Sequence, residues 1–255
     1  TGNVDFNGDL DVDGTSNLDV IDVDGAANFA ADVTFADGAD IITASAGTSN
    51  FRAGVNAGNS ITSGGNYNVV VGDEAGTAIT TGDQNVAIGY GALDADTLGS
   101  RSVAVGAVAL TSQNFTSATN AYNVGIGYFA GAGITTGVSN TLIGGLSGDA
   151  ITTGGSNSAV GAEALSATTT GNSNVAVGRW SMAANTTASE NVAVGVASLS
   201  TNTTGTANVA VGYLALNLST TASNNTAVGY HSLKANTTGA RLTSVGARSG
   251  MQNTT

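Results

Sequence analysis

The sequence predicts an all-β fold: a trimeric parallel β-solenoid, or β-roll, of about eleven 17-residue coils, preceded by a β-rich fibrous stem. Three observations support this prediction. A glycine recurs every 17 residues, each repeat holds short β-branched runs, and the 255 residues include 37 Gly but no Pro. Such runs disfavour helices, and 17 residues are too few for a helical-pair repeat of roughly 33 residues. Two short strands and two turns per coil are therefore expected.

Composition and charge exclude several classes of function. The net charge is −12, and only 6 residues are Lys or Arg, too few to neutralise many phosphates, so no nucleic-acid partner is expected. The absence of Cys excludes a disulfide framework, a thiolate zinc site and a Cys nucleophile. No apolar run approaches the roughly 18 residues that span a bilayer, so membrane insertion is not expected.

Residues 1–50 are predicted to form an acidic β stem or shaft segment, because they contain ten acidic residues and no basic ones. Asp alternates with apolar residues, as in the run from Asp9 to Gly14, and pairs such as Asp24-Gly25 mark turns. One such half-buried strand has no core of its own, so three intertwined chains are expected here.

A calcium site is the weaker interpretation of this segment. Asp9, Asp11 and Asp13 match the opening of a calcium loop, but its twelfth position holds Val20 instead of a bidentate Glu. A solvated acidic face is favoured, and no other metal and no cofactor is predicted.

Residues 51–255 are predicted to form the 17-residue-repeat β-roll. Position 0 denotes the repeat glycine, and a degenerate unit around Gly54 precedes the eleven regular ones. At about 4.8 Å per coil, eleven coils rise roughly 53 Å. The chain stops within a repeat at Thr255, so a fragment of a longer fibre is expected. The repeat glycines are Gly72, Gly89, Gly106, Gly127, Gly144, Gly161, Gly178, Gly195, Gly212, Gly229 and Gly246.

The pentad Asn-Val-Ala-Val-Gly supplies the strand of each coil. Glycine is expected where a left-handed backbone or a close approach of chains excludes a Cβ atom. Asparagine at position −4 is expected to bond backbone in the preceding turn and to stack on the same amide one coil away. The clearest structural repeat residues are Asn174, Val175, Val177, Gly178, Asn191, Gly195, Asn208 and Gly212.

The alternation of the strand predicts self-association. Positions −3 and −1 share one face, and their Val and Ile residues are expected to fill the coil interior. Position −2 then points outward, yet it is small and apolar, as at Ala176 and Ala193. A strand that is apolar on both faces is covered on both. A homotrimer is therefore expected, with a second backbone against position −2.

The pentads ending at Gly178, Gly195 and Gly212 resemble the head repeats (Asn-x-Val-Ala-Val-Gly) of trimeric autotransporter adhesins. Residues 54–93 and the stem phrase Asp-Val-Asp-Gly resemble tail-fibre-like proteins of marine bacteriophages. The first resemblance implies a left-handed β-roll whose three copies pack through their inner strands. The adhesin repeats are shorter, so the Thr-Thr-Gly arm here is expected to be an enlarged outer loop.

These resemblances imply a structural fibre protein of a bacteriophage tail or virion appendage that mediates or projects host attachment. The alternative is the head of a trimeric adhesin, extracellular on a bacterial surface. Expected partners are other fibre, tail or cell-surface proteins and a host-surface receptor, either glycan or protein.

Catalysis is not predicted. His231 is the sole histidine, no pair of acids recurs in register, and no Gly-Lys-Ser/Thr follows a glycine-rich phrase. A tail depolymerase is a lower alternative, and the Thr-Thr pairs at positions +8 and +9 raise an ice-binding solenoid as another.

Candidate receptor contacts lie on a four-residue insertion between Gly106 and Gly127 and beside a row of tyrosines at position +1. The insertion contributes Phe115 and Tyr122, and Trp180 lies beside the row. Packing between coils is the competing interpretation of these aromatic residues. The tyrosines of the row are Tyr90, Tyr128, Tyr213 and Tyr230.

Overall fold

The computed structural model describes residues 46–254. Two compact units are distinguished, residues 1–41 and residues 42–255, and only the second contains described residues. The calcium candidates Asp9, Asp11 and Asp13 and nearly all of the predicted stem therefore lie outside the described residues.

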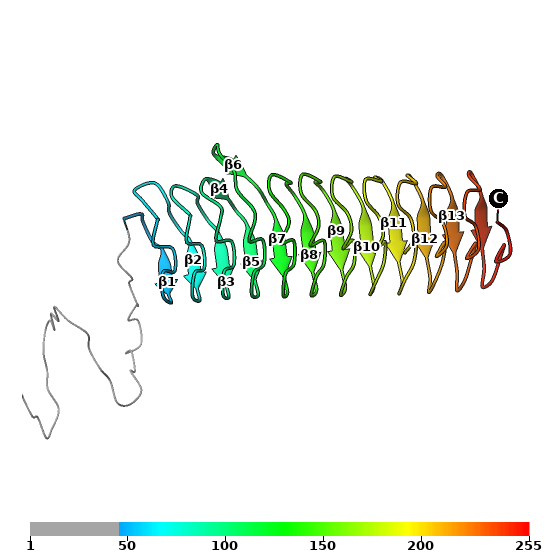
Figure 1. The fold of residues 1–255 in the computed structure, drawn as a ribbon, viewed down its shortest axis with the longest axis horizontal. Helices are drawn as coiled ribbons and strands as arrows, with labels where there is room; N and C mark the ends of the chain where they lie inside the picture. Colours follow the sequence, from blue (N-terminus) through cyan, green and yellow to red (C-terminus); the bar gives the residue numbers. More distant parts are fainter. Residues whose placement is uncertain (1–45, 255) are drawn as a thin grey trace, which may run out of the picture. The chain divides into compact units, whose positions relative to one another are not determined.

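The described chain is all-β and forms the predicted parallel solenoid (Figure 1). Its main sheet has twelve strands in the order β1-β2-β3-β5-β7-β8-β9-β10-β11-β12-β13-β14, every neighbouring pair parallel. The strands are β1 Phe51–Ala53, β2 Val69–Val71, β3 Val86–Ile88, β5 Val103–Val105, β7 Val124–Ile126, β8 Thr141–Ile143, β9 Ser158–Val160, β10 Val175–Val177, β11 Val192–Val194, β12 Val209–Val211, β13 Thr226–Val228 and β14 Thr243–Val245.

The register confirms that successive pentads lie side by side. Val175 of β10 pairs with Val192 of β11, which is 17 residues further along the chain. The degenerate unit also belongs to the stack, because β1 pairs with β2 at an offset of 18 residues, Phe51 with Val69. The roll therefore has one more strand than the eleven regular repeats.

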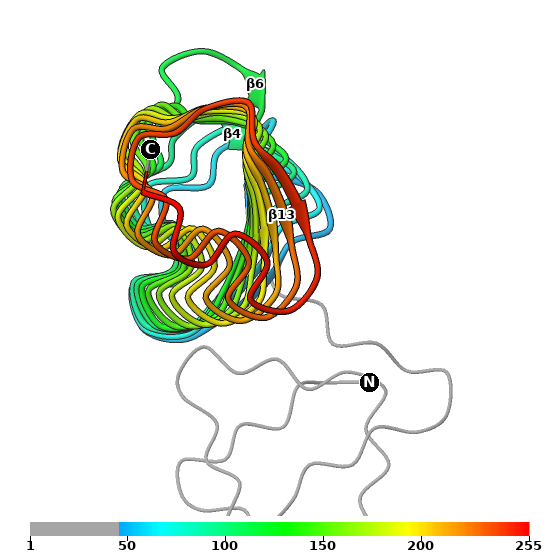
Figure 2. The ribbon, with the colours of Figure 1, turned by 90° about the vertical axis from the view of Figure 1, so that its right-hand side faces the viewer.

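Most coils contain one strand, where two were expected (Figure 2). The Thr-Thr-Gly arm bonds the next coil, with the N–H of Thr169 donating to the carbonyl of Thr186 (2.8 Å), but it forms no strand in the regular coils. Residues in the left-handed conformation bend each coil at its corners, for example Ser173, Trp180 and Met182 with φ of 58°, 59° and 49°. These corners keep the extended runs short.

The prediction of which strand face is internal was wrong. Ala176 at position −2 is fully buried, whereas Val177 at position −1 is 37% exposed and Val175 at −3 is only partly buried. The interior is too narrow for a large residue at every position: a Cβ on Gly125 would lie 2.9 Å from Cγ of Leu110. Small residues at position −2 thus fit the chain's own coil, and not a second backbone.

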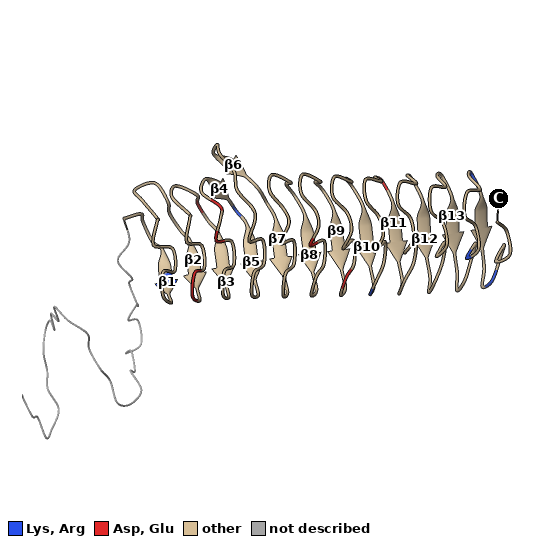
Figure 3. Cartoon of the chain, viewed as in Figure 1, with Lys and Arg blue, Asp and Glu red and all other residues tan. Residues whose placement is uncertain are grey.

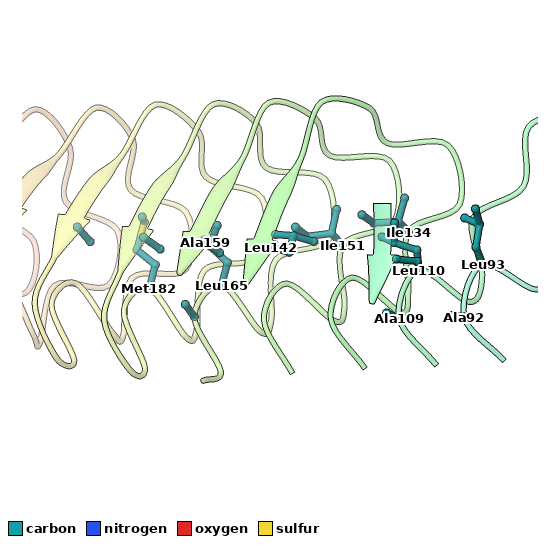
Figure 4. Packing of buried hydrophobic residues seen from close by; sticks show 14 of the residues in the cluster. Ala92, Leu93, Ala109, Leu110, Ile134, Leu142, Ile151, Ala159, Leu165 and Met182 are labelled. Atoms are coloured by element: carbon teal, nitrogen blue, oxygen red, sulfur yellow. The ribbon is translucent and has the colours of Figure 1, made fainter. Parts of the chain in front are cut away.

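Each coil from that of Gly54 to that of Gly229 buries one large apolar side chain that comes from either position +4 or position +7 (Figure 4). Where position +7 is Ile, position +4 is Gly, because a Cβ on Gly148 would lie 2.9 Å from Cδ1 of Ile151. Where position +4 is Leu or Met, position +7 is polar. The Gly/Ile pairs are 58/61, 76/79, 131/134 and 148/151; the other pairs are Leu93/Asp96, Leu110/Gln113, Leu165/Thr168, Met182/Asn185, Leu199/Asn202, Leu216/Ser219 and Leu233/Asn236.

The insertion leaves the regular path as a protruding loop, as predicted (Figures 1 and 2). A small second sheet joins this loop to the preceding coil: β6 (Thr119–Asn120) pairs in parallel with β4 (Gly99–Ser100), which precedes Gly106. Phe115 is only 6% exposed and packs at the base of this loop instead of on its surface.

Candidate functional site

A buried asparagine ladder runs through the solenoid and holds each coil to itself and to the next. The side-chain N–H of Asn191 donates to the carbonyl of Gly205 (3.0 Å), which closes its own coil. The Oδ1 atom of Asn174 accepts the backbone N–H of Asn191 (3.1 Å), and Oδ1 of Asn191 accepts that of Asn208 (2.9 Å). The predicted role of this asparagine as a link between coils is confirmed.

The ladder is interrupted at Ser102, and buried side chains from the insertion region bridge the gap. Nε2 of Gln113 donates to Oγ of Ser102 (3.0 Å), and Nδ2 of Asn123 donates to Oε1 of Gln113 (2.8 Å). Gln113 also donates to Asp96 (2.5 Å), whose carboxylate accepts the N–H of Phe115 (3.1 Å). Burial raises the pKa of Asp96, against the lowering effect of these hydrogen bonds.

The glycine column confirms both reasons expected for glycine at position 0. Gly178 has a φ of +125°, and a Cβ there would lie 2.7 Å from the carbonyl carbon and oxygen of Gly195. The close approach is between coils of one chain. Backbone atoms at that distance leave no space for a side chain.

The outward face of the sheet is a candidate binding surface, which we call the outer strand face and define as positions −3 and −1 of the twelve strands. It contains no charged residue. A continuous exposed surface of apolar side chains such as Val and Ile is typical of protein interfaces. Val245 in the last coil is 67% exposed, and the members that follow it in the regular coils are 36–40% exposed: Ile88, Ile126, Ile143, Val160, Val177 and Val194.

The two threonine rows differ in their hydrogen bonding. Oγ1 of Thr186 at position +8 donates to the carbonyl of Thr203 (3.0 Å), and most members of its row bond the next coil in the same way. The threonines at position +9 are exposed. The position +9 threonine of each pair therefore faces solvent. The exposed members include Thr136, Thr153, Thr170, Thr187, Thr204, Thr221 and Thr238.

The three candidate receptor contacts lie in different places. Phe115 is buried, whereas Tyr122 is 52% exposed and accepts a hydrogen bond from Arg101 (2.9 Å). Trp180 is 39% exposed, and the guanidinium of Arg179 lies 3.6 Å from the centre of its ring. Only Tyr122 and Trp180 thus present side chains at the surface.

Part of the tyrosine row packs between coils. The rings of Tyr213 and Tyr230 stack at 5.6 Å, and Tyr230 stacks on His231 at 3.9 Å. Their faces cover one another, which leaves ring edges and hydroxyl groups to solvent. Desolvation, followed by the charges of Lys234 and Arg248, lowers the pKa of His231, so this ring is neutral at physiological pH.

Charge is distributed unevenly along the roll (Figure 3). We use the name side groove for the strip formed by positions +2, +5 and +6, which line a cavity in the last three coils. Asp149 and Glu163 occupy positions +5 and +2 of successive coils. Desolvation and then the charge of Glu163 raise the pKa of Asp149. At the equivalent positions near the C-terminal end stand Lys234 and Arg248.

Residues 46–254 contain no group of three His, Asp or Glu placed to hold a metal ion, and no helix capable of crossing a membrane. No protein-family model matches the sequence, and no curated protein and no solved structure was found to be similar to it.

Proposed function

We propose that this chain is a structural segment of a homotrimeric fibre on a virion, a bacteriophage tail fibre or similar appendage that projects or mediates attachment to a host surface. The observation that carries the proposal is the uncharged, partly exposed outer strand face, which repeats over all twelve strands of the main sheet. The pentad resemblance to trimeric fibre proteins supports the same function.

The occupant of the outer strand face is two further copies of the same chain. Its Val and Ile side chains recur once per coil, at the strand spacing of about 4.8 Å. Another copy has the same repeat along its whole length, so it keeps its side chains in step with this face from β2 to β13. A globular partner with an irregular surface cannot match the repeat of this face in the same way.

Sedimentation equilibrium at micromolar concentration tests this assembly. A mass three times that of the 24.7 kDa chain is expected. The double variant Val177→Lys/Val194→Lys should sediment as a folded monomer, because each lysine would be buried between chains. Thr187→Lys, on the exposed threonine row, is the matched control and should remain trimeric. A monomeric wild-type chain contradicts the assembly.

The owner of the fibre is tested separately by immunogold labelling with antibodies against the chain. Label along an appendage of virus particles is expected. Label on bacterial cells instead supports the alternative, an extracellular adhesin head. Cleavage of a host polysaccharide by the chain would favour the tail depolymerase.

One observation favours a second candidate, an ice-binding solenoid. The exposed threonines at position +9 form a regular row, with one hydroxyl group in each of the seven coils from Thr136 to Thr238. A thermal hysteresis gap in a solution of the chain would support this candidate, and its absence would remove it.

A further inference from the structure

The C-terminal part of the side groove opens into a cavity of about 540 Å³ that belongs to neither the outer strand face nor the insertion. Its walls come from three successive coils. Leu218, Ala235 and Met251 supply apolar surface, whereas Lys234 and Arg248 supply cationic groups; His231 and Gln252 complete the lining. The size is that of a small-ligand site.

The charge of this cavity is uncompensated. No Asp or Glu occupies positions +2, +5 or +6 in the last four coils, from Ala197 to Gln252. No ion pair of Lys234 or Arg248 occurs among the described residues. Lys234 and Arg248 both line this one cavity. Desolvation, followed by the charges of these two residues, lowers the pKa of His231 beside them.

One wall is held rigidly by aromatic stacking. His231 lies on Tyr230 at 3.9 Å, Tyr230 on Tyr213 at 5.6 Å, and the guanidinium of Arg248 lies 5.9 Å from the Tyr230 ring centre. This stack fixes the positions of His231 and Arg248 before any ligand arrives. Pre-organised donors lose less conformational entropy on binding.

We propose that this cavity binds an acidic saccharide unit of the host surface, with Lys234 and Arg248 on its carboxylate or sulfate group. A sugar ring has the matching chemistry: an apolar C–H face for Leu218 and Met251 and hydroxyl groups for Gln252. The inference deepens the proposed function, on which its biological setting rests, by naming the ligand class and its place.

The same groove supplies an internal comparison. In the coils of Gly144 and Gly161 the equivalent positions hold Asp149 and Glu163, which repel an anion. Recognition is therefore confined to the C-terminal coils, and a uniform ladder of sugar sites along the roll is not expected.

Isothermal titration calorimetry on the full chain tests the site with three hexasaccharides: oligoalginate, which carries carboxylates, a κ-carrageenan fragment, which carries sulfates, and neutral maltohexaose. Binding of at least one acidic probe and none of maltohexaose is expected. The probe that binds identifies the acid group. Lys234→Gln and Arg248→Gln should each weaken binding about tenfold, the usual loss of a charge-assisted hydrogen bond.

Arg241→Gln is the matched control, because it removes the same charge from an exposed turn outside the groove. Its affinity should equal that of the wild type, and all variants should keep the wild-type circular dichroism spectrum. The site is overturned if neither acidic probe binds, if Arg241→Gln weakens binding as much as Arg248→Gln, or if poly-glutamate binds more tightly than both oligosaccharides.

This outcome is independent of the assembly. A trimer without saccharide affinity overturns the site and leaves the fibre proposal standing. A monomeric chain that binds an acidic saccharide overturns the fibre proposal and leaves the site standing.

Discussion

The two faces of each strand differ in how far one chain completes them. The inner face, at position −2, is fully buried at Ala176 and its equivalents, within an interior filled by the chain itself. The outer face, at positions −3 and −1, leaves Val177 and Val194 more than one-third exposed. The repeat therefore defines the coil interior through side-chain volume and leaves an uncharged outer face for the partner proposed above. Inner positions are small or matched in volume, and outer positions are uncharged whatever their size.

The largest effect on stability is expected at an asparagine inside the coil, and an asparagine on the surface provides the comparison. Asn191→Ala removes the side-chain hydrogen bonds from Nδ2 to Asn174 and Gly205 and leaves the buried N–H of Asn208 without its acceptor. A loss of about 3 kcal/mol in the free energy of unfolding is expected, measured by urea titration. Asn172→Ala, an exposed asparagine that accepts the N–H of Gly155, should cost under about 1 kcal/mol. Equal losses at both positions would contradict the ladder's role.

The next effect tests volume matching inside the coil. Gly148→Leu forces a side chain against Ile151 and Leu142 and should destabilise the roll by about 2 kcal/mol in the same titration. Adding both Leu142→Ala and Ile151→Asn recreates the interior of the later coils, such as Ala193, Leu199 and Asn202, and should restore most of the loss. A triple variant no more stable than Gly148→Leu would contradict volume matching.

The smallest effect concerns the buried carboxyl group beneath the insertion. Burial raises the pKa of Asp96, so the folded state holds this proton more tightly than the unfolded state. Its contribution to stability is therefore fully present below the unfolded pKa and is lost as pH rises through the folded pKa. Thermal melts of the wild type should show this decline above the usual Asp range, and Asp96→Asn should lack it. An identical pH dependence in both proteins would contradict the assignment.

Much of the fold was predictable because the period of the repeat determines how successive coils stack. The period of Gly178, Gly195 and Gly212 predicted parallel coils, and the asparagine at position −4 predicted a ladder between them. The choice of inner face was not predictable from alternation, because both faces of Val175-Ala176-Val177 are apolar. Only the volume left inside a coil decides between them.

The candidate sites were harder to predict. The network of Asp96 and Gln113 lies where the repeat is interrupted, so periodicity gave no expectation for it. A signal was nevertheless present: position +7 is polar wherever position +4 is Leu or Met. Phe115 was expected on the surface of the insertion, but an aromatic ring there gains more from burial at the loop's base.

We propose above that copies of the same chain cover the outer strand face and exclude water from it. The chain has no native Cys, so single cysteines can be introduced and their maleimide labelling rates compared under native conditions. Val194→Cys lies on the outer strand face, where the native side chain is 36% exposed in the single chain, whereas Thr187→Cys lies on the exposed threonine row. Under native conditions, we expect the cysteine at position 194 to react far more slowly than the cysteine at position 187. After unfolding in urea, the two cysteines should react at equal rates. Equal native rates would contradict the proposal.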